Sequence, residues 1–446
     1  MFASSTFQSM QKILPEKSGD ETSNGIRRTN GVAGTLVLLF AYMANIAAIP
    51  YAISKSGYLV SILFILYGGI VSYINGWYVC DMCARDQSLT TFAAVGRKAF
   101  GTAGAYFTVG FQLFLFVLAV IPLFNALAQQ TQNLTQYACE IDYMYAYLVL
   151  FCIIAIMPLM REIKFMAYFS VVSAVICAII IIANSILDKH DPQFCPETVG
   201  QQGEVTLENA FAGIGMFSLA FAASGGLPEI ISEMKEPSKA KLSWGINVLF
   251  ALSVYAVVGF VGNWAYGSLV NPLIFLPPMR NNWMAKVGLG LQLYSYVVAT
   301  TIMINIVVVK IEMLLGVHPE TWWSPKKLGV IPPVLSRFII RSSYIAILWT
   351  VGLALPFFGP FQSLVGGLTC TPLALFIPAV YHMKIYWEEY NLFRKALVGF
   401  YVVVGMGLTC LATYMAIQSI VSATEGTQHY FELPCKAQEA LECTLN

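Results

Sequence analysis

Long apolar stretches separated by short polar segments dominate the chain. Each stretch is close to the roughly 20 residues that a helix needs to cross a bilayer. The stretches predict eleven spans, at about residues 31–53, 58–80, 104–128, 143–160, 165–187, 209–231, 244–267, 286–309, 338–357, 361–381 and 396–421. The longer polar segments include a tail at 1–30, an outer loop at 188–208 and a second tail at 422–446. The pattern predicts an all-α integral membrane protein.

Two of the predicted spans contain a proline at matching depths. Pro50 and Pro228 each lie 19 residues after the start of their spans, at residues 31 and 209. A proline inside a helix removes a hydrogen-bond donor and clashes with the carbonyl four residues earlier, so it breaks or kinks the helix. Matching interruptions in two halves of a membrane protein point to a transporter's binding site. Two kinked structural helices are the simpler alternative, because proline is common in membrane spans.

The two broken spans open two comparable sets of five. The first set covers residues 31–187 and the second covers 209–381, and the helix at 396–421 remains over. Because five spans separate the two breaks, the broken helices cross the membrane in opposite directions. The hydropathy pattern therefore predicts a 5+5 inverted repeat plus one extra helix, with helices 1 and 6 broken.

Composition and charge agree with this topology. Of 446 residues, 57% are hydrophobic and only 11% are charged, whereas soluble domains carry about 25% charged residues. With a cytoplasmic N-terminus, 20 of the 25 lysines and arginines fall on the inner side, as the positive-inside rule requires. The exceptions are Lys55, Lys189, Arg280, Lys286 and Lys436. The C-terminal tail is then predicted outside the cell or in a lumen, in the plasma membrane or a vacuolar or other endomembrane.

Four cysteines lie in polar segments on the predicted outer side, where disulfides persist. They are Cys139, Cys195, Cys435 and Cys443. Three pairings are possible, and we favour Cys139–Cys195 together with Cys435–Cys443. The sequon at Asn133 also falls on the outer side and predicts a glycan.

A broken helix exposes unpaired backbone groups at mid-membrane. The N–H groups and positive dipole of a half-helix attract an anion, and the opposing carbonyls suit a cation, so the pair of breaks fits a zwitterion. Gly225 and Gly226 would allow close backbone approach. The candidate substrate-binding residues around the breaks are Asn45, Ile46, Ala47, Ala48, Tyr51, Gln112, Phe217, Phe221, Ser224, Gly225 and Gly226. The alternative roles are core packing for the aromatic residues and an interhelical hydrogen bond for Gln112.

Four further polar residues are candidates for ion coupling. Glu229 is the one acid predicted well inside a span, and an intramembrane carboxylate is a functional candidate by default. An acid at a helix start, paired with the helix dipole, is its alternative reading. Thr300, Thr301 and Asn305 could coordinate a cation, although hydroxyls in helices often bond their own backbone. The residues predict no metal site and no cofactor.

Several segments resemble the amino acid/auxin permease family. Residues 48–58, which include Pro50 and Tyr51, are similar to its first-span motif, and residues 220–237 are similar to its sixth-span motif. Residues 89–101 resemble the loop after the second span, and 356–359 with 374–378 resemble the tenth-span region of plant-type members. The resemblance covers about residues 30–421. It implies a leucine-transporter-like fold and amino acid transport, often driven by a proton gradient.

The main hypothesis is a secondary active, alternating-access transporter of amino acids, with protons as the preferred coupling ion. Met43, Asn45 and Ser224 depart from the residues usual in the family, so an amino-acid-like organic acid such as auxin is an alternative substrate. A non-transporting amino acid sensor on the same fold is another alternative. An enzyme is not expected, because no catalytic motif or pair of histidines lies in a span. The expected partners are a small-molecule substrate and the lipid bilayer, and no nucleic acid.

Overall fold

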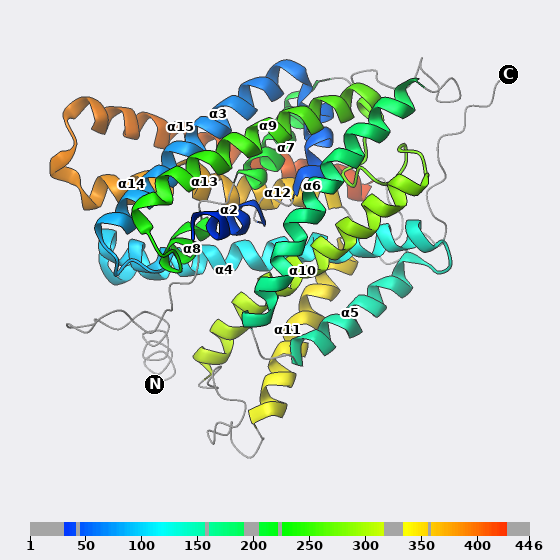
Figure 1. The fold of residues 1–446 in the computed structure, drawn as a ribbon, viewed down its shortest axis with the longest axis horizontal. Helices are drawn as coiled ribbons and strands as arrows, with labels where there is room; N and C mark the ends of the chain where they lie inside the picture. The colour runs from blue at the N-terminus through cyan, green and yellow to red at the C-terminus, as the bar shows by residue number, and fades with distance from the viewer. Residues whose placement is uncertain are drawn as a thin grey trace.

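The fold is built almost entirely from helices. The computed structural model describes residues 31–41, 45–156, 160–190, 205–221, 225–315, 333–355 and 358–425, and this part of the chain contains no β-strand. Its helices, labelled as in Figure 1, are α2 (Val32–Ala41), η1 (Asn45–Ala48), α3 (Ile49–Arg85), α4 (Phe92–Thr135), α5 (Glu140–Ile156), α6 (Met160–His190), α7 (Leu207–Ala220), α8 (Leu227–Ser232), η3 (Pro237–Lys239), α9 (Ala240–Tyr266), η4 (Gly267–Leu269), α10 (Trp283–Leu314), α11 (Pro333–Ala354), α12 (Phe358–Val365), η5 (Gly366–Cys370), α13 (Thr371–Leu375), α14 (Ile377–Ile385), η6 (Trp387–Glu389) and α15 (Leu392–Glu425).

Eight stretches of helix among the described residues are long and apolar enough to cross a membrane. Each spans at least 18 residues, close to the length that the hydrocarbon core requires. They are Ile46–Arg85, Phe92–Thr135, Tyr168–His190, Pro237–Leu269, Trp283–Glu312, Leu335–Ala354, Phe358–Ile385 and Leu392–Ser422. The chain is therefore an integral membrane protein, as the sequence predicts.

Two of the long helices turn sharply at glycines. In α3 the backbone leaves the helix at Gly57, where φ is 76°, and in α4 it leaves at Phe100 and Gly101, where φ of the glycine is 65°. Positive φ is unfavourable for residues with a side chain. Gly57 therefore separates a short first segment of α3 from a long second segment. Gly101 separates a short helix at 92–100 from the long remainder of α4.

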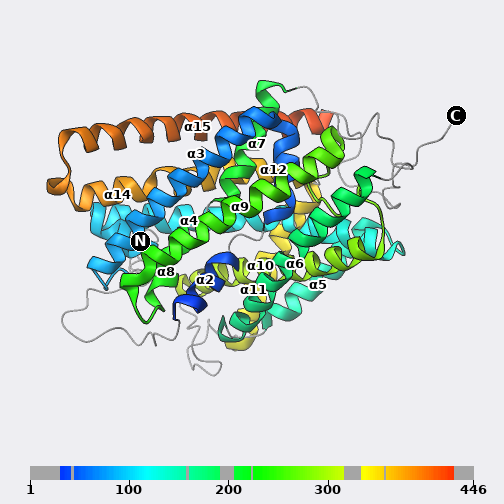
Figure 2. The same ribbon diagram turned by 45° about the horizontal axis from the view of Figure 1, so that its top comes forward.

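The helices pack as a bundle with two buried apolar clusters. One cluster surrounds α3, α7 and α9 and includes the fully buried Trp244 and Tyr255. The other joins α4, α5, α10, α11 and α12, and in it Phe151 meets Phe124 edge to face. Helices α3 and α9 lie side by side, while α5 and α11 lie at the opposite edge of the bundle (Figures 1 and 2).

Helix α15 lies along the outside of the bundle (Figure 2). Only 17% of its most apolar stretch is buried, against 78% for the stretch Phe358–Ile385. Large side chains such as Phe400 and Val403 point outward. In a membrane protein these faces contact lipid, so α15 is a peripheral helix and α12–α14 form an interior one.

The interior stretch α12–α14 is irregular. A π-helical turn, η5, separates α12 from α13, and in it the Thr371 N–H donates to the Gly366 carbonyl five residues earlier. A π-turn carries one residue more than an α-helical turn and is frequent at functional sites. Here Gly366 lies directly against α7. A Cβ atom on Gly366 would be 1.8 Å from the backbone oxygen of Gly215.

Candidate functional site

The two proline-containing segments each begin a helix with the proline in its first turn. Helix α2 ends at Ala41, and α3 begins at Ile49 with Pro50 next. Helix α7 ends at Ala220, and α8 begins at Leu227 with Pro228 next. Proline is tolerated in the first turn because its missing N–H has no intrahelical partner there. Residues 42–44 and 222–224, including Met43 and Ser224, lie outside the described residues.

The first turns of α3 and α8 receive no side-chain cap. The residues that precede the two helices are Ala48 and Gly226. Neither has a polar side-chain group that could cap the helix. The first N–H groups of a helix have no intrahelical acceptor and present a partial positive charge. The start of α3 can therefore accept an anionic group such as a carboxylate.

The residues preceding α3 are buried next to α7. The exposed fractions of Ile46, Ala47 and Ala48 are 8%, 4% and 0%. Gly213 of α7 approaches the same region, because a Cβ atom on it would be 2.9 Å from the carbonyl oxygen of Ala52. The structure therefore brings the first candidate segment against α7. Asn45 is the first residue of η1, and the structure describes its backbone but not its side chain.

The aromatic candidates point to different neighbours. The Tyr51 ring lies beside Gly359 of α12, with the Lys55 ammonium 5.3 Å from its centroid. Phe217 is 2% exposed and belongs to the same buried cluster as Ile46 and Ala47. Phe221, by contrast, packs beside Gly68 of α3 and meets the Tyr255 ring edge to face. Their roles in substrate binding remain predictions.

Side chains from α3 and α9 satisfy the last carbonyls of α7. The Ser72 hydroxyl donates to the Phe221 carbonyl at 3.2 Å, and the Tyr255 hydroxyl donates to the Ala220 carbonyl at 3.1 Å. The end of a helix leaves carbonyls without intrahelical donors, so these bonds stabilise the end of α7 inside the bundle. Sequence reasoning missed both residues, because nothing local marks a serine or tyrosine as a partner for a distant helix end.

Gln112 connects α4 to the segment before α8. Its Nε2 donates to the Gly225 carbonyl at 2.8 Å, and the side chain is 5% exposed. Gly225 in turn lies close to Leu373 of α13, and Gly226 follows it. The amide thus satisfies a backbone carbonyl between the two helices, which is the interhelical bond considered as its alternative reading.

Glu229, in the first turn of α8, places its carboxylate at the beginning of the short helix 92–100 within α4. Its Oε1 accepts a hydrogen bond from the Phe92 N–H at 3.1 Å, while Oε2 is buried with no hydrogen-bond partner among the described residues. The Lys310 side chain of α10 acts on this carboxylate electrostatically. A carboxylate at a helix N-terminus is stabilised by the helix dipole. Phe92 and Lys310 were not found from the sequence, because only the fold brings them to Glu229.

The three other ion-coupling candidates lie on α10 and differ in their bonding. Thr301 donates its hydroxyl to the Val297 carbonyl at 2.8 Å, within its own helix. Asn305 donates to the Thr301 carbonyl at 2.9 Å and accepts from Arg341 at 3.4 Å. Thr300 is fully buried, and its hydroxyl has no partner within the described ranges. Of the three, Thr300 is the one with a hydroxyl still available.

The predicted disulfides and glycan on the outer side fall only partly on residues that the structure describes. Cys139 is disulfide-bonded, and Cys195, Cys435 and Cys443 all lie outside the described residues, so the pairing stays a prediction. Asn133 lies in the last turn of α4 with 9% of its side chain exposed. Glycosylation of Asn133 remains a prediction.

The fold and the interrupted segments define a membrane protein with buried backbone between its helices, and comparison with known proteins places it in a family. The family model described as transmembrane amino acid transporter protein matches residues 28–418. The chain belongs to this family.

Several amino acid transporters align with this chain over most of their own length. "Amino acid transporter AVT1E" of Arabidopsis thaliana is 23% identical over 384 residues, covering 83% of this chain and 70% of the relative. The "N amino acid transport system protein" of Neurospora crassa is 24% identical over 409 residues, covering 87% and 84%. "Amino acid transporter ANT1" of Arabidopsis thaliana is 22% identical over 429 residues, covering 91% and 95%.

A solved structure supports the fold. The Eremococcus coleocola manganese transporter, in complex with an aromatic bis-isothiourea substituted compound, aligns with a TM-score of 0.53 and 13% sequence identity. The alignment covers 92% of this chain and 93% of the transporter. At this identity the likeness concerns the fold alone.

Proposed function

We propose that this chain is a secondary active transporter of amino acids that works by alternating access. The observation that carries the proposal is the pair of proline-started helices, α3 and α8, whose uncapped first turns follow buried segments inside the bundle. N–H groups at the start of α3 would bind the substrate carboxylate. Carbonyls of the interrupted segments would bind its ammonium group. The names of the relatives support amino acids as the substrate class.

The topology proposed for this transporter is a leucine-transporter-like arrangement of eleven spans, with an inverted repeat and broken helices 1 and 6. In it α2 with the start of α3 forms span 1, α7 with α8 forms span 6, and α15 forms span 11. The two broken spans would rock around the central site to open it to one side at a time.

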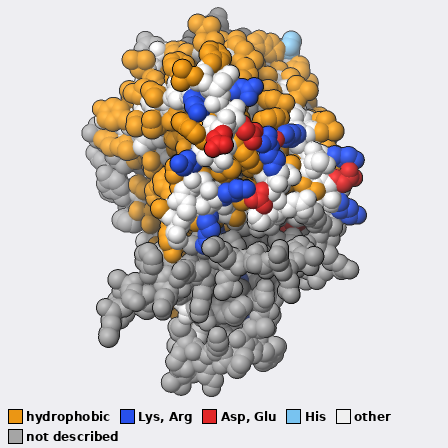
Figure 3. Space-filling model, turned by 90° about the vertical axis from the view of Figure 1, so that its left-hand side faces the viewer, with side chains coloured by type: hydrophobic (Ala, Val, Ile, Leu, Met, Phe, Trp, Pro, Cys, Tyr) orange, Lys and Arg blue, Asp and Glu red, His pale blue; other side chains and the backbone are white. Residues whose placement is uncertain are grey.

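The proposed orientation places the basic end of the molecule in the cytoplasm. This end, shown in Figure 3, carries the exposed Lys98, Lys239 and Arg85 near the ends of α3, α4 and α9. Cytoplasmic segments of membrane proteins carry an excess of lysine and arginine. Cys139, at the opposite end of α4, would then face an oxidising compartment.

Amino acid uptake into proteoliposomes tests the proposal directly. A panel of labelled amino acids would be offered in acidic and in neutral outer buffer, with and without sodium. Saturable uptake that accelerates in acidic buffer is the expected result. Binding without flux would instead indicate a sensor, and competition by auxin but not by amino acids would indicate an organic acid carrier.

Glu229 is the proposed proton-coupling residue. The substitution Glu229→Gln keeps an oxygen that can accept from the Phe92 N–H but removes the titratable carboxyl group. We expect expression to be retained and the pH dependence of uptake to disappear. Glu236→Gln is the matched control, because Glu236 is exposed and forms a surface ion pair with Lys239. Uptake by Glu229→Gln that keeps the wild-type pH dependence would remove Glu229 from the coupling mechanism.

A further inference from the structure

The inner half of the proposed tenth span is a separate helix with a joint before it. Helix α13 ends at Leu375 and α14 begins at Ile377, and Phe376 between them leaves the helical conformation with φ of −140°. Pro378 accounts for this interruption, because it lacks an N–H and its ring clashes with the carbonyl four residues earlier, that of Ala374. The ladder of helical hydrogen bonds is interrupted here, so a change of angle costs less at this point than inside a continuous helix.

One asparagine from α3 holds this joint. The Nδ2 of Asn75 donates to the Ala374 carbonyl at 2.8 Å and to the Leu375 carbonyl at 2.7 Å. Its Oδ1 accepts from the Tyr401 hydroxyl of α15 at 2.7 Å, and the side chain is fully buried. A buried carbonyl without a donor is costly. Asn75 therefore stabilises the joint by supplying donors to the two carbonyls that precede it.

The part of the span before the joint is fixed by backbone contacts. A Cβ atom on Gly366 would lie 1.8 Å from the Gly215 oxygen of α7, and one on Gly367 would lie 3.1 Å from the carbonyl carbon of Ala412 in α15. Backbones in such close contact pack as one rigid unit. We therefore expect α12 and η5 to stay with α7 and α15.

After the joint, α14 is held by side-chain hydrogen bonds instead. The hydroxyls of Tyr381 and of Thr108 in α4 hydrogen-bond to each other at 2.6 Å. His382 donates from Nε2 to Asp81 Oδ2 of α3 at 3.1 Å, because a carboxylate only accepts. The Nδ1 of His382 lies 2.8 Å from the Tyr390 hydroxyl, in the segment that follows α14. These bonds can break and form again by small movements of side chains.

Separation of α14 from α3 would leave no buried charge of this cluster unpaired. Asp81 also receives Lys241 from α9 and Arg85 from its own helix, so it keeps two cations when His382 leaves. The pair of Arg85 with Glu389 also joins α3 to the segment after α14, but both side chains are about half exposed to solvent. Exposed ion pairs contribute little to stability. The contacts that hold α14 are therefore reversible at low cost.

Helix α14 lies between the proposed substrate segment and the basic end of the molecule. Leu373 of α13 approaches Gly225, and α14 continues from α13 towards the basic end (Figure 1). The Tyr381 ring of α14 lies 5.8 Å from the Phe92 ring, and the Phe92 N–H donates to Glu229 at 3.1 Å. A movement of α14 therefore changes the packing of the short helix that supports the proposed coupling carboxylate.

We propose that α14 is a hinged gate at the cytoplasmic end of the tenth span, and that Asn75 is the positioning residue that holds its hinge. The gate turns about Phe376, breaks the hydrogen bonds of Tyr381 and His382, and opens the substrate site towards the basic end. The inference rests on the proposed function, because alternating access requires an opening on each side of the membrane.

Cysteine labelling on the two sides of the joint tests the gate. Ala374 of α13 and Ala379 of α14 are fully buried alanines on opposite sides of Phe376. Each is replaced by cysteine in a background with all ten native cysteines replaced, and permeabilised cells are treated with a membrane-impermeant maleimide. Minor states of proteins are commonly about 0.1–10% populated, so we expect Ala379→Cys to react slowly, but at least about tenfold faster than Ala374→Cys.

Uptake connects this labelling to transport. In proteoliposomes, amino acid uptake by Ala379→Cys should fall in proportion to the fraction labelled, because the adduct prevents α14 from closing. Uptake that is unchanged by complete labelling would overturn the gate, and so would equal labelling rates for the two cysteines.

The role of Asn75 is tested with Asn75→Leu, which keeps the size of the side chain and removes both polar groups. We expect it to accelerate labelling of Ala379→Cys about fivefold, the effect of one net hydrogen bond. The maximal rate of uptake should fall while KM changes less than about twofold. Asn247→Leu is the control, because Asn247 is also fully buried and its side chain has no hydrogen-bond partner among the described residues. Equal labelling rates in Asn75→Leu and the control would remove Asn75 from the hinge.

Hydrogen exchange of the wild-type chain repeats the comparison without any substitution, which keeps the test decisive if a variant does not fold. Backbone amides of α14 should exchange faster than those of α12 and η5, and equal protection would overturn the gate. In that case amino acid uptake, and with it the proposed function, still stands. A wild-type chain that takes up no amino acid contradicts the proposed function, and the gate falls with it.

Discussion

Two glycines bring the backbones of α7 and the α12–η5 segment into close contact. A Cβ atom on Gly366 of η5 would lie 1.8 Å from the oxygen of Gly215, and a Cβ atom on Gly215 would lie 2.2 Å from the oxygen of Ser363. Both neighbours are backbone atoms, which cannot move aside by changing a rotamer. The contact between α7 and α12–η5 therefore depends on glycine at both positions.

We expect Gly366→Ala to destabilise the protein by about 1–3 kcal/mol, the usual range for overpacking. The measurement is the thermal midpoint of the purified protein in detergent. Gly110→Ala is the control, since no atom lies within 4 Å of the added Cβ and alanine favours a helix. Equal thermal midpoints for Gly366→Ala and wild type would show that the added methyl group is accommodated between α7 and η5 without loss of stability.

Local and distant effects differ in how far the sequence predicts them. The prolines at 50 and 228 mark helix starts from the sequence, because the geometry of proline acts on its own neighbours. The partner of Gln112 could not be predicted, because Gly225 is 113 residues away and reaches it only through the packing of α4. For Thr301 the structure shows the alternative to cation coordination, because its hydroxyl donates to a carbonyl of its own helix.

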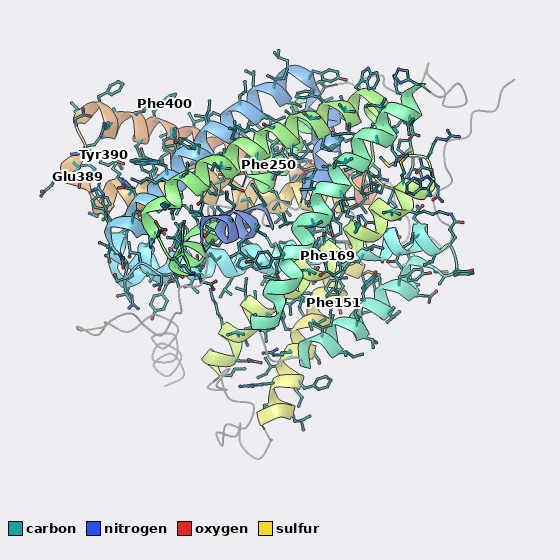
Figure 4. All side chains as sticks on the ribbon, in the orientation of Figure 1. Phe151, Phe169, Phe250, Glu389, Tyr390 and Phe400 are labelled. Carbon is teal, nitrogen blue, oxygen red and sulfur yellow. The ribbon has the colours of Figure 1, made fainter. Side chains whose placement is uncertain are left out.

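At the scale of elements, a buried carboxylate joins three helices at the basic end. Asp81 of α3 is 4% exposed and receives Lys241 of α9, Arg85 of its own helix and His382 of α14. His382 also hydrogen-bonds to the Tyr390 hydroxyl at 2.8 Å. Arg85 continues to Glu389 at 2.7 Å; Glu389 and Tyr390 are labelled in Figure 4 beyond the end of α14. The cluster fixes the ends of α3, α9 and α14 relative to one another.

Asp81→Asn should loosen this end of the bundle. It removes one charge and leaves Lys241 and Arg85 without their shared carboxylate. A fully buried pair costs about 3–5 kcal/mol when one partner is removed. Lys241 and Arg85 are 34% and 44% exposed, so we expect about 1–2 kcal/mol. A double-mutant cycle with Lys241→Met measures the coupling, and additive effects would contradict a shared pair.

The neighbouring Asp86 provides a surface control for that experiment. Partial burial alone raises the pKa of the Asp86 carboxyl, but hydrogen bonds from Lys98 and Ser88 outweigh it and hold the pKa below the ordinary value of an aspartate. A lowered folded-state pKa contributes stability above the unfolded pKa, and the contribution is lost as the pH falls through the folded value. Because Lys98 and Asp86 are both partly exposed to solvent, Asp86→Asn at neutral pH should cost less than about 1 kcal/mol.

The regular spans were predictable as elements, whereas the irregularities that no proline marks were not. Apolar length alone identifies α6, α9, α10 and α15, because a bilayer imposes one length on every spanning helix. The π-turn at 366–370 leaves no comparable pattern in the sequence, since an added residue shifts the side-chain phase without changing hydropathy. The kink at Gly101 is likewise visible only in the backbone.

At the scale of the whole molecule, the chain has two distinct ends. Helix α3 ends and α15 begins near the basic end, which carries Arg85, Lys98 and Lys241. The opposite end carries Cys139, the end of α6 and the start of α10 (Figure 1). The charge pattern predicts which end is cytoplasmic, but the orientation itself is decided during insertion and needs a separate measurement.

Labelling of single cysteines in sealed cells would determine the orientation. In a background with all ten native cysteines replaced, Trp283→Cys places a thiol at the start of α10, where the native residue is 73% exposed. Lys98→Cys places one at the basic end. A membrane-impermeant maleimide should label the first in intact cells and the second only after permeabilisation. The reverse pattern would invert the proposed topology.

The π-turn at Gly366–Cys370 also determines which side of α12 and which side of α13 face their neighbours. Each residue advances an α-helix by about 100°, so the extra residue rotates α12 by that amount relative to α13. Because of this rotation, Gly366 faces α7 while Leu373 approaches Gly225. A chain shortened by one residue here would keep its hydropathy and its length across the bilayer, yet it would present the wrong side of the tenth span to the sixth.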